Sequence, residues 1–341
     1  MPRRTSLWFL DRKKIGFRED EVAITGEDEL LVETLYSGIS HGTERLIYRG
    51  EVAEGLQLDA ALTHFEGAFP FPVKYGYSNV GTIKETGTGV TQFHNGDRVF
   101  AFVPHETAYV IRESEAIPLP GGVEPLYGVF IPSLETAVNA VLDSAIKLGE
   151  TVVVFGQGVV GLFITQLMRR AGAGTIVTVD ALASRRRLSL EFGADYALEP
   201  ATADLARTVQ EQTNGVGADL IVEASGSPRA LDAALPLAAF QAQILVVSWY
   251  GTKRVTLNLG EEFHRKRLSL KSSQVSFVDP ALSPRWNKQR RMALVLGLLG
   301  ELNQQVLRNA TRMVAFEEAA SAYAVIDAHP EEALQVVLSY V

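Results

Sequence analysis

An uninterrupted apolar strand followed by a glycine-rich turn constrains the fold of this 341-residue chain most strongly. The stretch TVVVFGQGVVGLFITQL, which starts at Thr151, places the pattern G-x-G-x-x-G directly after the strand and at the start of a helix. A strand that is apolar on both faces is typical of a parallel sheet. The glycines permit a tight turn and let a pyrophosphate approach the helix N-terminus. The pattern therefore predicts a dinucleotide site, formed by Gly156, Gly158, Val159, Val160 and Gly161.

An acidic residue at the end of the next strand predicts which dinucleotide binds. The strand TIVTVD ends at Asp180, nineteen residues after Gly161. A carboxylate there accepts hydrogen bonds from the adenosine ribose and repels a 2′-phosphate, which favours NAD and makes NADP the less favoured cofactor. The three arginines that follow, Arg185 to Arg187, leave two interpretations open. In the first, they bind a 2′-phosphate. In the second, which we favour, they lie on the first turn of the next helix, and one of them stacks on the adenine. We select Arg185 for that role.

The pattern of predicted secondary structure changes near residue 120. Before that point, short β-type runs alternate with glycine and proline, which predicts a mostly β domain. After it, strands alternate with helical patterns, which predicts a doubly wound parallel α/β sheet. RLSLKSS (267–273) is the expected last strand of that sheet, and 51–72 is an expected long loop. The β-domain strands are expected at 29–40, 80–87, 97–103 and 107–112, the late helices at 287–302 and 316–328, and a closing strand at 332–341.

Composition excludes several classes of function. The formal net charge is −8 and the chain has no dense block of Lys and Arg, so a nucleic-acid partner is not expected. The chain has no cysteine, which excludes disulfides and cysteine-ligated metal sites. No apolar run approaches the roughly 20 residues that span a bilayer, and the N-terminal segment lacks a signal-peptide core. We therefore expect a cytoplasmic protein that acts on a small molecule and has no membrane partner.

Several motifs together resemble a known superfamily. They are GIS-x-GTE at 38–44, GDRV at 96–99, the helix PSLETAVNAVLDSAIKLGE, the cofactor motif, VEASGS at 222–227 and FEEAASAYAVID near the end. With them the chain resembles the medium-chain dehydrogenase/reductase (alcohol dehydrogenase-like) superfamily over nearly its full length. The resemblance implies an α/β fold, with a chaperonin-10-like β-barrel catalytic domain over 1–120, a Rossmann domain over 121–275, and a return to the catalytic domain over 276–341. SGISHGTE, PHETAYVI, SSQVS and RWNKQRR also resemble bacteriochlorophyllide a dehydrogenase-like proteins.

The residues that hold the catalytic zinc in many members of this superfamily do not match here. The position of the cysteine ligand falls on His41 or Ser40, depending on the alignment, and the histidine ligand falls on Tyr77. The glutamate that precedes a proline near the cofactor strand falls on Ile131. A catalytic zinc takes three protein ligands, so at most one survives and we expect no zinc. Four side chains are weighed as substitute ligands: Glu44, His64, Glu66 and Glu135.

Without a metal, side-chain donors must stabilise the oxygen that becomes negative during hydride transfer. Tyr77 is our first candidate, His41 is the second, and Thr43 matches a hydroxyl residue that relays protons in zinc relatives. Each has a structural alternative: Tyr77 fills the space of the metal, His41 is satisfied by the backbone, and Thr43 caps a helix.

Further residues are assigned to binding. Trp249 and Tyr250 follow the strand QILVVS, at the end where open α/β sheets bind ligands. They are expected to line the binding sites of the nicotinamide and the substrate, or else to pack between subunits. His105 reaches the substrate or pins a loop. The complete binding set adds Ser225 and Trp249 for the cofactor and Ser40, His105 and Tyr250 for the substrate pocket.

Three functions remain open at this point. The first is a zinc-independent NAD(H)-linked oxidoreductase of secondary alcohols and ketones, the second an enone or quinone reductase, and the third a non-catalytic nucleotide-binding protein. Relatives pair the last Rossmann strand across a two-fold axis, so the resemblance also implies a homodimer through 267–273.

Overall fold

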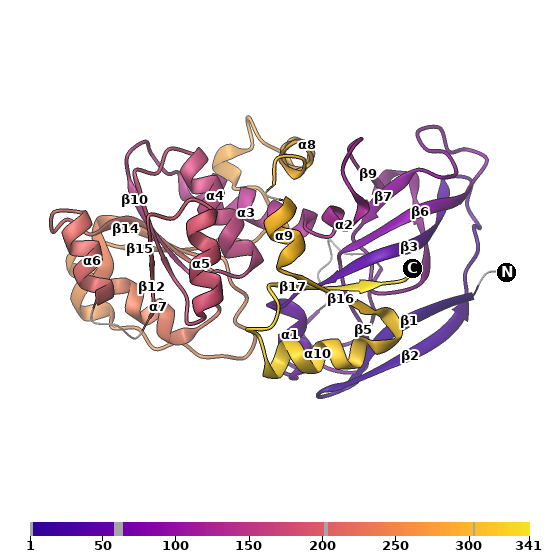
Figure 1. Cartoon of the computed structure of the whole chain (residues 1–341), viewed down its shortest axis with the longest axis horizontal. Helices are drawn as coiled ribbons and strands as arrows, with labels where there is room; N and C mark the ends of the chain where they lie inside the picture. Colours follow the sequence, from indigo (N-terminus) through magenta and orange to yellow (C-terminus); the bar gives the residue numbers. More distant parts are fainter. Residues whose placement is uncertain (1–2, 58–63, 201–203, 303) are drawn as a thin grey trace. The chain divides into compact units, whose positions relative to one another are not determined.

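The structure, a computed structural model, describes residues 3–57, 64–200, 204–302 and 304–341 (Figure 1). It forms two compact units: unit 1 comprises 1–132 with 296–341, and unit 2 comprises 133–295. The expected domain boundaries lay after residues 120 and 275, whereas the two units meet at 132/133 and 295/296. Within the loop expected over 51–72, residues 58–63 lie outside the described part of the chain.

Unit 1 is organised around the long strand β3 (Glu29–Ile39), which is buried at both its beginning and its end. β3 pairs antiparallel with β6, β8 and β17, and β17 in turn pairs parallel with β16 (Figure 1). The described strands give two sheets, in the orders β2-β1-β5-β4 and β16-β17-β3-β6-β7-β9, with β8 also on β3. The other strands of unit 1 are β1 (Arg3–Asp11), β2 (Lys14–Glu21), β4 (Glu66–Gly67), β5 (Val73–Lys74), β6 (Asn79–Thr86), β7 (Arg98–Ala101), β8 (Ala108–Arg112), β9 (Ile117–Pro118), β16 (Thr311–Ala315) and β17 (Gln335–Ser339).

The helices of unit 1 are short. They are α1 (Thr43–Tyr48), α2 (Pro125–Gly128), α9 (Gln304–Asn309) and α10 (Ala319–Ala328), with 3₁₀ turns at Glu113–Glu115 and Phe316–Glu318. Leu46 of α1, Tyr323 of α10 and Phe9 of β1 belong to one buried cluster with Leu338 of β17. Burial of this cluster fixes where α1 begins, and therefore where the turn before it lies.

Unit 2 is a parallel sheet of the order β12-β11-β10-β13-β14-β15 over the described residues, and every adjacent pair in it is parallel (Figure 1). Its strands are β10 (Thr151–Phe155), β11 (Thr175–Val179), β12 (Tyr196–Leu198), β13 (Ala218–Glu223), β14 (Ala238–Val246) and β15 (Ser269–Ser272). Its helices are α4 (Val159–Arg170), α5 (Ala183–Glu191), α6 (Asp204–Gln212) and α7 (Pro228–Ala234), with short helical segments at Leu235–Leu237, Leu259–Phe263 and Pro280–Leu282. β10 is buried at every position, as its apolar run predicts. The order is the Rossmann order, in which ligands bind beyond the carboxyl ends of β10 and β13. The predicted fold class is confirmed.

A buried arginine explains why unit 2 extends beyond the expected boundary at 275. Helices α3 (Ile131–Ser144) and α8 (Lys288–Leu299) both cross from one unit into the other along the chain. Arg291 of α8 is 1% exposed; it donates to Glu135 Oε1 at 2.8 Å and to Asn139 Oδ1 at 2.5 Å, both on α3. A buried guanidinium requires such partners, so the first half of α8 stays with α3. Across the described residues, no helix combines the length and the apolar character that crossing a bilayer requires.

Unit 1 also buries an ionic cluster beside β5. Lys74 Nζ lies 3.5 Å from Glu106 Oε2, Arg4 Nη1 lies 3.4 Å from the same oxygen, and Lys74 also pairs with the more exposed Glu66. Burial raises the pKa of Glu106 to about 7, although Lys74 and Arg4 oppose the rise. A carboxyl group whose pKa is higher in the folded state than in the unfolded chain binds its proton more tightly when folded.

This shift predicts that the free energy of unfolding of unit 1 falls as pH rises from about 4.5 to about 7. Below that window both states are protonated, and above it the folded state holds a carboxylate that burial disfavours; the loss is on the order of 3 kcal/mol at most. Denaturant unfolding at several pH values measures it, and Glu106→Gln should remove most of this slope. Glu33→Gln, a change at an exposed carboxyl group paired with Lys84, is the control. An unchanged slope in Glu106→Gln would contradict the assignment.

Candidate functional site

The glycine-rich turn of unit 2 leaves open space in front of a helix N-terminus. Gly156 has φ +88°, and a Cβ there would lie 2.7 Å from the backbone of Ser225. A Cβ on Gly161 would lie 1.9 Å from the Gly156 carbonyl oxygen, so this glycine allows α4 to pack onto the turn. A Cβ on Gly158 would meet nothing closer than Arg185 Nη1 at 4.0 Å. Gly158 is the N-cap of α4 and supplies no side-chain cap, so the first amides of the helix, including those of Val159 and Val160, face a space that suits an anion.

Asp180 ties the turn to the second strand of the nucleotide motif. Its carboxylate is 8% exposed; Oδ2 accepts from the backbone N–H of Gln157 at 2.7 Å and Oδ1 accepts from that of Leu182 at 2.8 Å. Each carboxylate oxygen has two acceptor sites, so both oxygens retain capacity for a ligand hydroxyl. Asp180 therefore positions the turn as well as offering acceptors beside it.

The three arginines after Asp180 differ in placement. The guanidinium of Arg185 lies nearest to Gly158; burial lowers the pKa of Arg185 and the charge of Asp180 opposes this. Arg186 turns back on the chain and donates to the carbonyl oxygens of Asp180, at 2.7 Å, and Ala181, at 2.9 Å. Arg187 is exposed on α5. Of the three, Arg185 is thus the one beside the turn.

Beyond the ends of β13 and β14 lie the remaining predicted cofactor residues. Glu223 is fully buried, and its Oε1 accepts from the Ser225 N–H at 2.7 Å, the Ser225 hydroxyl at 2.5 Å and the Gly226 N–H at 2.9 Å. Trp249 is 38% exposed. The Tyr250 hydroxyl donates to the Ser227 carbonyl at 3.4 Å, and burial and the charge of Glu223 raise its pKa. The sequence prediction included Ser225 but missed Glu223, which fixes the backbone around it.

In unit 1, the structure brings three predicted residues into one hydroxyl cluster, made of Ser40, Thr43 and Tyr77. The Tyr77 hydroxyl donates to Ser40 Oγ at 2.6 Å and lies 3.5 Å from Thr43 Oγ1. The Thr43 N–H donates to Ser40 Oγ at 3.4 Å. All three residues are half-buried as a whole. Burial raises the pKa of Tyr77, the hydrogen bonds to Ser40 and Thr43 oppose the rise, and the charge of Glu44 adds to it.

The two predicted histidines are placed differently from this cluster. His41 Nε2 accepts from the backbone N–H of Val336 at 3.1 Å, so that nitrogen holds β17 beside the turn. His105 is fully buried, with Nε2 2.9 Å from Glu44 Oε2 and Nδ1 2.6 Å from Ser37 Oγ. A ring in this position contacts the protein rather than solvent, which fits the alternative in which His105 pins its loop.

The positions of the zinc ligands hold side chains with other partners. Ser78 donates to the Val129 carbonyl at 2.8 Å. Among the substitute ligands, His64 pairs with Glu115 at 3.2 Å, Glu66 with Lys74, and Glu135 with Arg291. Within the described ranges, no group of three or more His, Asp or Glu side chains could hold a metal ion. The residues aligned with the zinc ligands, Ser40 or His41, Tyr77 and Ile131, do not supply the three nitrogen, sulfur or carboxylate ligands that a catalytic zinc takes.

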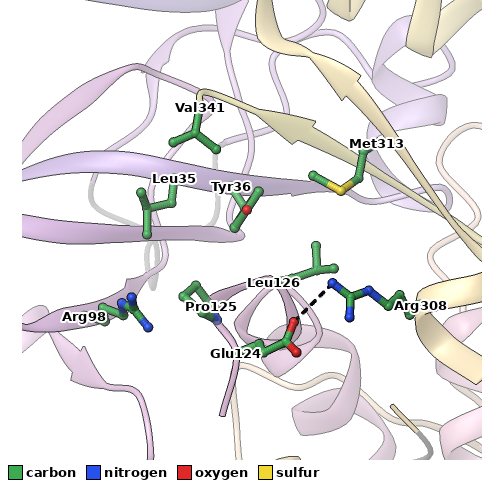
Figure 2. Close-up of a pocket in the computed structure, with 9 residues that line it drawn as sticks. All are labelled: Leu35, Tyr36, Arg98, Glu124, Pro125, Leu126, Arg308, Met313 and Val341. Atoms are coloured by element: carbon green, nitrogen blue, oxygen red, sulfur yellow. Dashed lines mark ion pairs between the residues drawn. The ribbon is translucent and has the colours of Figure 1, made fainter. Parts of the chain in front are cut away.

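Unit 1 also contains a pocket of about 320 Å³ away from these residues (Figure 2). Apolar side chains form part of its wall, and Arg308 pairs with Glu124 across it at 3.5 Å. Its lining is Leu35, Tyr36, Arg98, Glu124, Pro125, Leu126, Arg308, Met313 and Val341. None of the predicted site residues lines it, and its opposed charges do not favour one kind of ligand.

Comparison with known proteins agrees with this architecture. Residues 26–130 match the alcohol dehydrogenase GroES-like domain and residues 159–287 match the zinc-binding dehydrogenase family. A D-guloside 3-dehydrogenase of Escherichia coli (strain K12) is 30% identical over 267 residues, which cover 76% of each chain. An alcohol dehydrogenase from E. coli CFT073 in complex with NADH has a TM-score of 0.78 at 20% identity, over 99% of both chains. A zinc-binding dehydrogenase from Sinorhizobium meliloti 1021 bound to NADP has a TM-score of 0.77 at 21% identity, over 99% of this chain and 100% of that one.

The chain belongs to the medium-chain dehydrogenase/reductase (alcohol dehydrogenase-like) superfamily. It is an oxidoreductase, as the resemblance in its motifs predicts.

Two glycines of the turn, Gly158 and Gly161, predict different effects of the same substitution. Gly161→Ala should lower the melting temperature by several degrees, because its Cβ would overlap a backbone oxygen that cannot move without the turn. Gly158→Ala should leave the melting temperature within about 1 °C, because its Cβ meets open space. Calorimetry of both variants tests this, and equal effects would contradict the packing described.

Proposed function

We propose that this oxidoreductase transfers hydride between NAD(H) and a secondary alcohol or ketone without a catalytic zinc. The observation that carries the proposal is the hydroxyl cluster of Ser40, Thr43 and Tyr77. The resemblance aligns Ser40 and Tyr77 with metal ligands of zinc relatives, and Thr43 with their proton-relaying hydroxyl. Hydroxyl groups in that position suit a carbonyl oxygen, since each can donate a hydrogen bond to it.

The cofactor would be held by unit 2. The space before α4 at Gly158 suits the pyrophosphate, and the acceptor capacity left on Asp180 suits the ribose hydroxyls. Arg185 would lie beside the adenosine, and Trp249 and Ser225 would line the route toward the nicotinamide. The bound nicotinamide supplies or accepts the hydride. Because Arg186 is occupied by backbone carbonyls, Asp180 and Arg185 are the charges beside this position, and Asp180 would repel a 2′-phosphate.

Ser40 is the donor that the hydrogen bonds favour. Its Oγ accepts from the Tyr77 hydroxyl and from the Thr43 N–H, so both lone pairs are used. Among the described residues its own proton has no hydrogen-bond acceptor, so it can point to a substrate oxygen. During reduction Ser40 would donate this proton as charge develops, Tyr77 would replace it, and a proton taken up from solvent would restore the phenol. His41 is the weaker candidate, since its Nε2 already accepts from Val336.

The substrate proposed is a secondary alcohol of a sugar or polyol. The name of the E. coli relative, D-guloside 3-dehydrogenase, supports this class. We also propose that the chain belongs to the subgroup of bacteriochlorophyllide a dehydrogenase-like proteins that its shorter motifs resemble. A screen of sugars, polyols and ketones beside enones and quinones, with NADH and NADPH, tests it. Activity confined to enones or quinones would establish C=C or quinone reduction instead, and NADH binding without any activity would favour a non-catalytic role.

We also propose a homodimer through the edge strand β15. Its residues Ser269, Leu270 and Ser272 are exposed, and exposed edge strands pair readily. The mass by light scattering should be twice 37.2 kDa at micromolar concentration. Leu270→Glu should halve it, whereas Leu190→Glu, at an exposed leucine of α5, should not. A monomeric wild-type protein would refute the proposal.

Asp180 predicts the cofactor preference. NADH should bind at least about tenfold more tightly than NADPH, roughly 1.4 kcal/mol, as measured by calorimetry. Asp180→Asn should reduce the ratio by removing the repulsion while leaving polar groups at the turn. Arg187→Ala, on the exposed side of α5, is the control and should not change it. An equal or reversed preference in the wild type would contradict the proposal.

The hydroxyl cluster predicts which side chains set turnover. Ser40→Ala and Tyr77→Phe should each lower kcat on the order of 100-fold, because each removes a donor to developing charge or its support. Thr43→Val should cost less, since Thr43 lies 3.5 Å from Tyr77. NADH affinity should stay nearly constant in all three. Tyr127→Phe, which removes a hydroxyl bonded to the Gln304 carbonyl, is the control. Full activity in both Ser40→Ala and Tyr77→Phe, or one essential zinc per chain, would refute the mechanism.

A further inference from the structure

A chain of buried polar groups lies next to the hydroxyl cluster in unit 1. Its five side chains come from separate elements: β3, α1, the segment before β8, α10 and the residue after β17. Three of them are fully buried and a fourth is 1% exposed. In order they are Tyr340, Ser37, His105, Glu44 and Tyr323, linked by Tyr340–Ser37 (2.9 Å), Ser37–His105 (2.6 Å), His105–Glu44 (2.9 Å) and Tyr323–Glu44.

The partners assign a direction to every proton in this chain. Glu44 Oε2 accepts from the Tyr323 hydroxyl and from the His105 Nε2–H. When the ring carries a single proton, His105 Nδ1 accepts from the Ser37 hydroxyl, which leaves Ser37 Oγ to accept from Tyr340. Because each donor has one acceptor and no proton is left over, the carboxylate of Glu44 fixes one tautomer of His105.

The chain ends on the backbone of the hydroxyl cluster. The second carboxylate oxygen, Glu44 Oε1, accepts from the Ser40 N–H at 2.8 Å. Glu44 also lies on the first turn of α1, and its own backbone N–H donates to the Ser40 carbonyl oxygen at 3.0 Å. Ser40 is therefore held at both its N–H and its carbonyl by the same residue, and its Oγ is left to meet Tyr77.

Stability alone does not account for a charge in this place. A carboxylate removed from water costs several kcal/mol, and well-packed apolar side chains often replace such groups without loss of stability. The negative charge also acts on the cluster, because it helps to keep Tyr77 a neutral phenol that can donate. A buried polar network that is fully satisfied is rigid, and rigidity is what a donor needs at a reacting oxygen.

We propose that Glu44 and His105 are positioning residues that hold Ser40 and Tyr77 in the geometry that donates to the substrate oxygen. The inference rests on the proposed role of the hydroxyl cluster. Neither residue touches substrate; they act through the turn at Ser40.

A matched pair of substitutions at His105 tests this. In His105→Gln the amide can still accept from Ser37 and donate to Glu44, because its oxygen and nitrogen are spaced much like the two ring nitrogens. In His105→Leu both hydrogen bonds are lost. We expect kcat to fall about tenfold to hundredfold in His105→Leu and to recover most of the wild-type value in His105→Gln. The KM of the substrate and the affinity for NADH should change less than about threefold. His94→Leu, at an exposed histidine of the same unit, is the control.

A second variant keeps the test informative if His105→Leu does not fold. Ser37→Ala removes the partner of His105 Nδ1 and leaves the carboxylate contact in place, so it should give a smaller loss of kcat in a folded protein. Glu44→Gln removes the charge near Tyr77, so the high-pH limb of the kcat profile should move to lower pH. A folded His105→Leu or Ser37→Ala protein with wild-type kcat, or an unmoved pH profile in Glu44→Gln, would overturn the inference.

Nitrogen NMR of the wild-type protein separates this inference from the proposed function. His105 should show an unprotonated Nδ1 and a protonated Nε2, as the partners of the two ring nitrogens require. This result needs no turnover, so it stands even if no alcohol proves to be a substrate. The opposite tautomer would overturn the positioning role in an active enzyme.

Discussion

The buried carboxylate of Glu44 is the constraint on which the geometry of unit 1 depends. A charge with no exposed surface must be met by donors, and here Ser40, His105 and Tyr323 supply them from three separate parts of the chain. None of these partners can shift alone without leaving a buried charge short of a hydrogen bond, which costs several kcal/mol. The carboxylate thus joins the end of β3, the start of α1 and helix α10 around one point, and the apolar cluster of Leu46, Tyr323 and Leu338 packs about it.

The sequence predicted those parts of the fold whose pattern is set locally. Strand β10 follows from its apolar run and the start of helix α4 from the spacing of the glycines before it, because a strand buried at every position keeps its pattern clear. The hairpin of β1 and β2 was missed, since β2 (KIGFREDE) is mostly exposed and rich in charge. β16 was missed for a similar reason, as its residues are intermediate or exposed. Such strands are defined by their partners, which a local pattern does not reveal.

The candidate site likewise has one part that the sequence predicted and one part that it did not. The turn at Gly156–Gly161 and the carboxylate of Asp180 were predictable because one contiguous βαβ segment supplies the residues that bind a dinucleotide. The Glu44 network was not, because its contacts join residues 61 and 279 positions apart. Sequence inspection singled out Glu44 and His105 separately, as a substitute ligand and as a pocket residue. The signal available was an unpaired polar residue in a buried segment, and that signal does not name a partner. Glu223 and Arg291 were missed for the same reason.

If hydroxyl groups act in place of a zinc ion, as proposed, the surrounding protein must provide something different. A zinc ion stabilises an alkoxide by its charge, which acts over a range of directions. A hydroxyl group acts by one directional hydrogen bond, which weakens steeply as its angle departs from linear. A site built from Ser40 and Tyr77 therefore depends on orientation more than a metal site does, and orientation comes from rigid neighbours. A network that holds Ser40 by its N–H, its carbonyl and its hydroxyl oxygen meets that need. The proposed zinc-free mechanism therefore gives a reason for a buried charge at Glu44, because that mechanism requires the fixed orientation that the carboxylate and its donors provide.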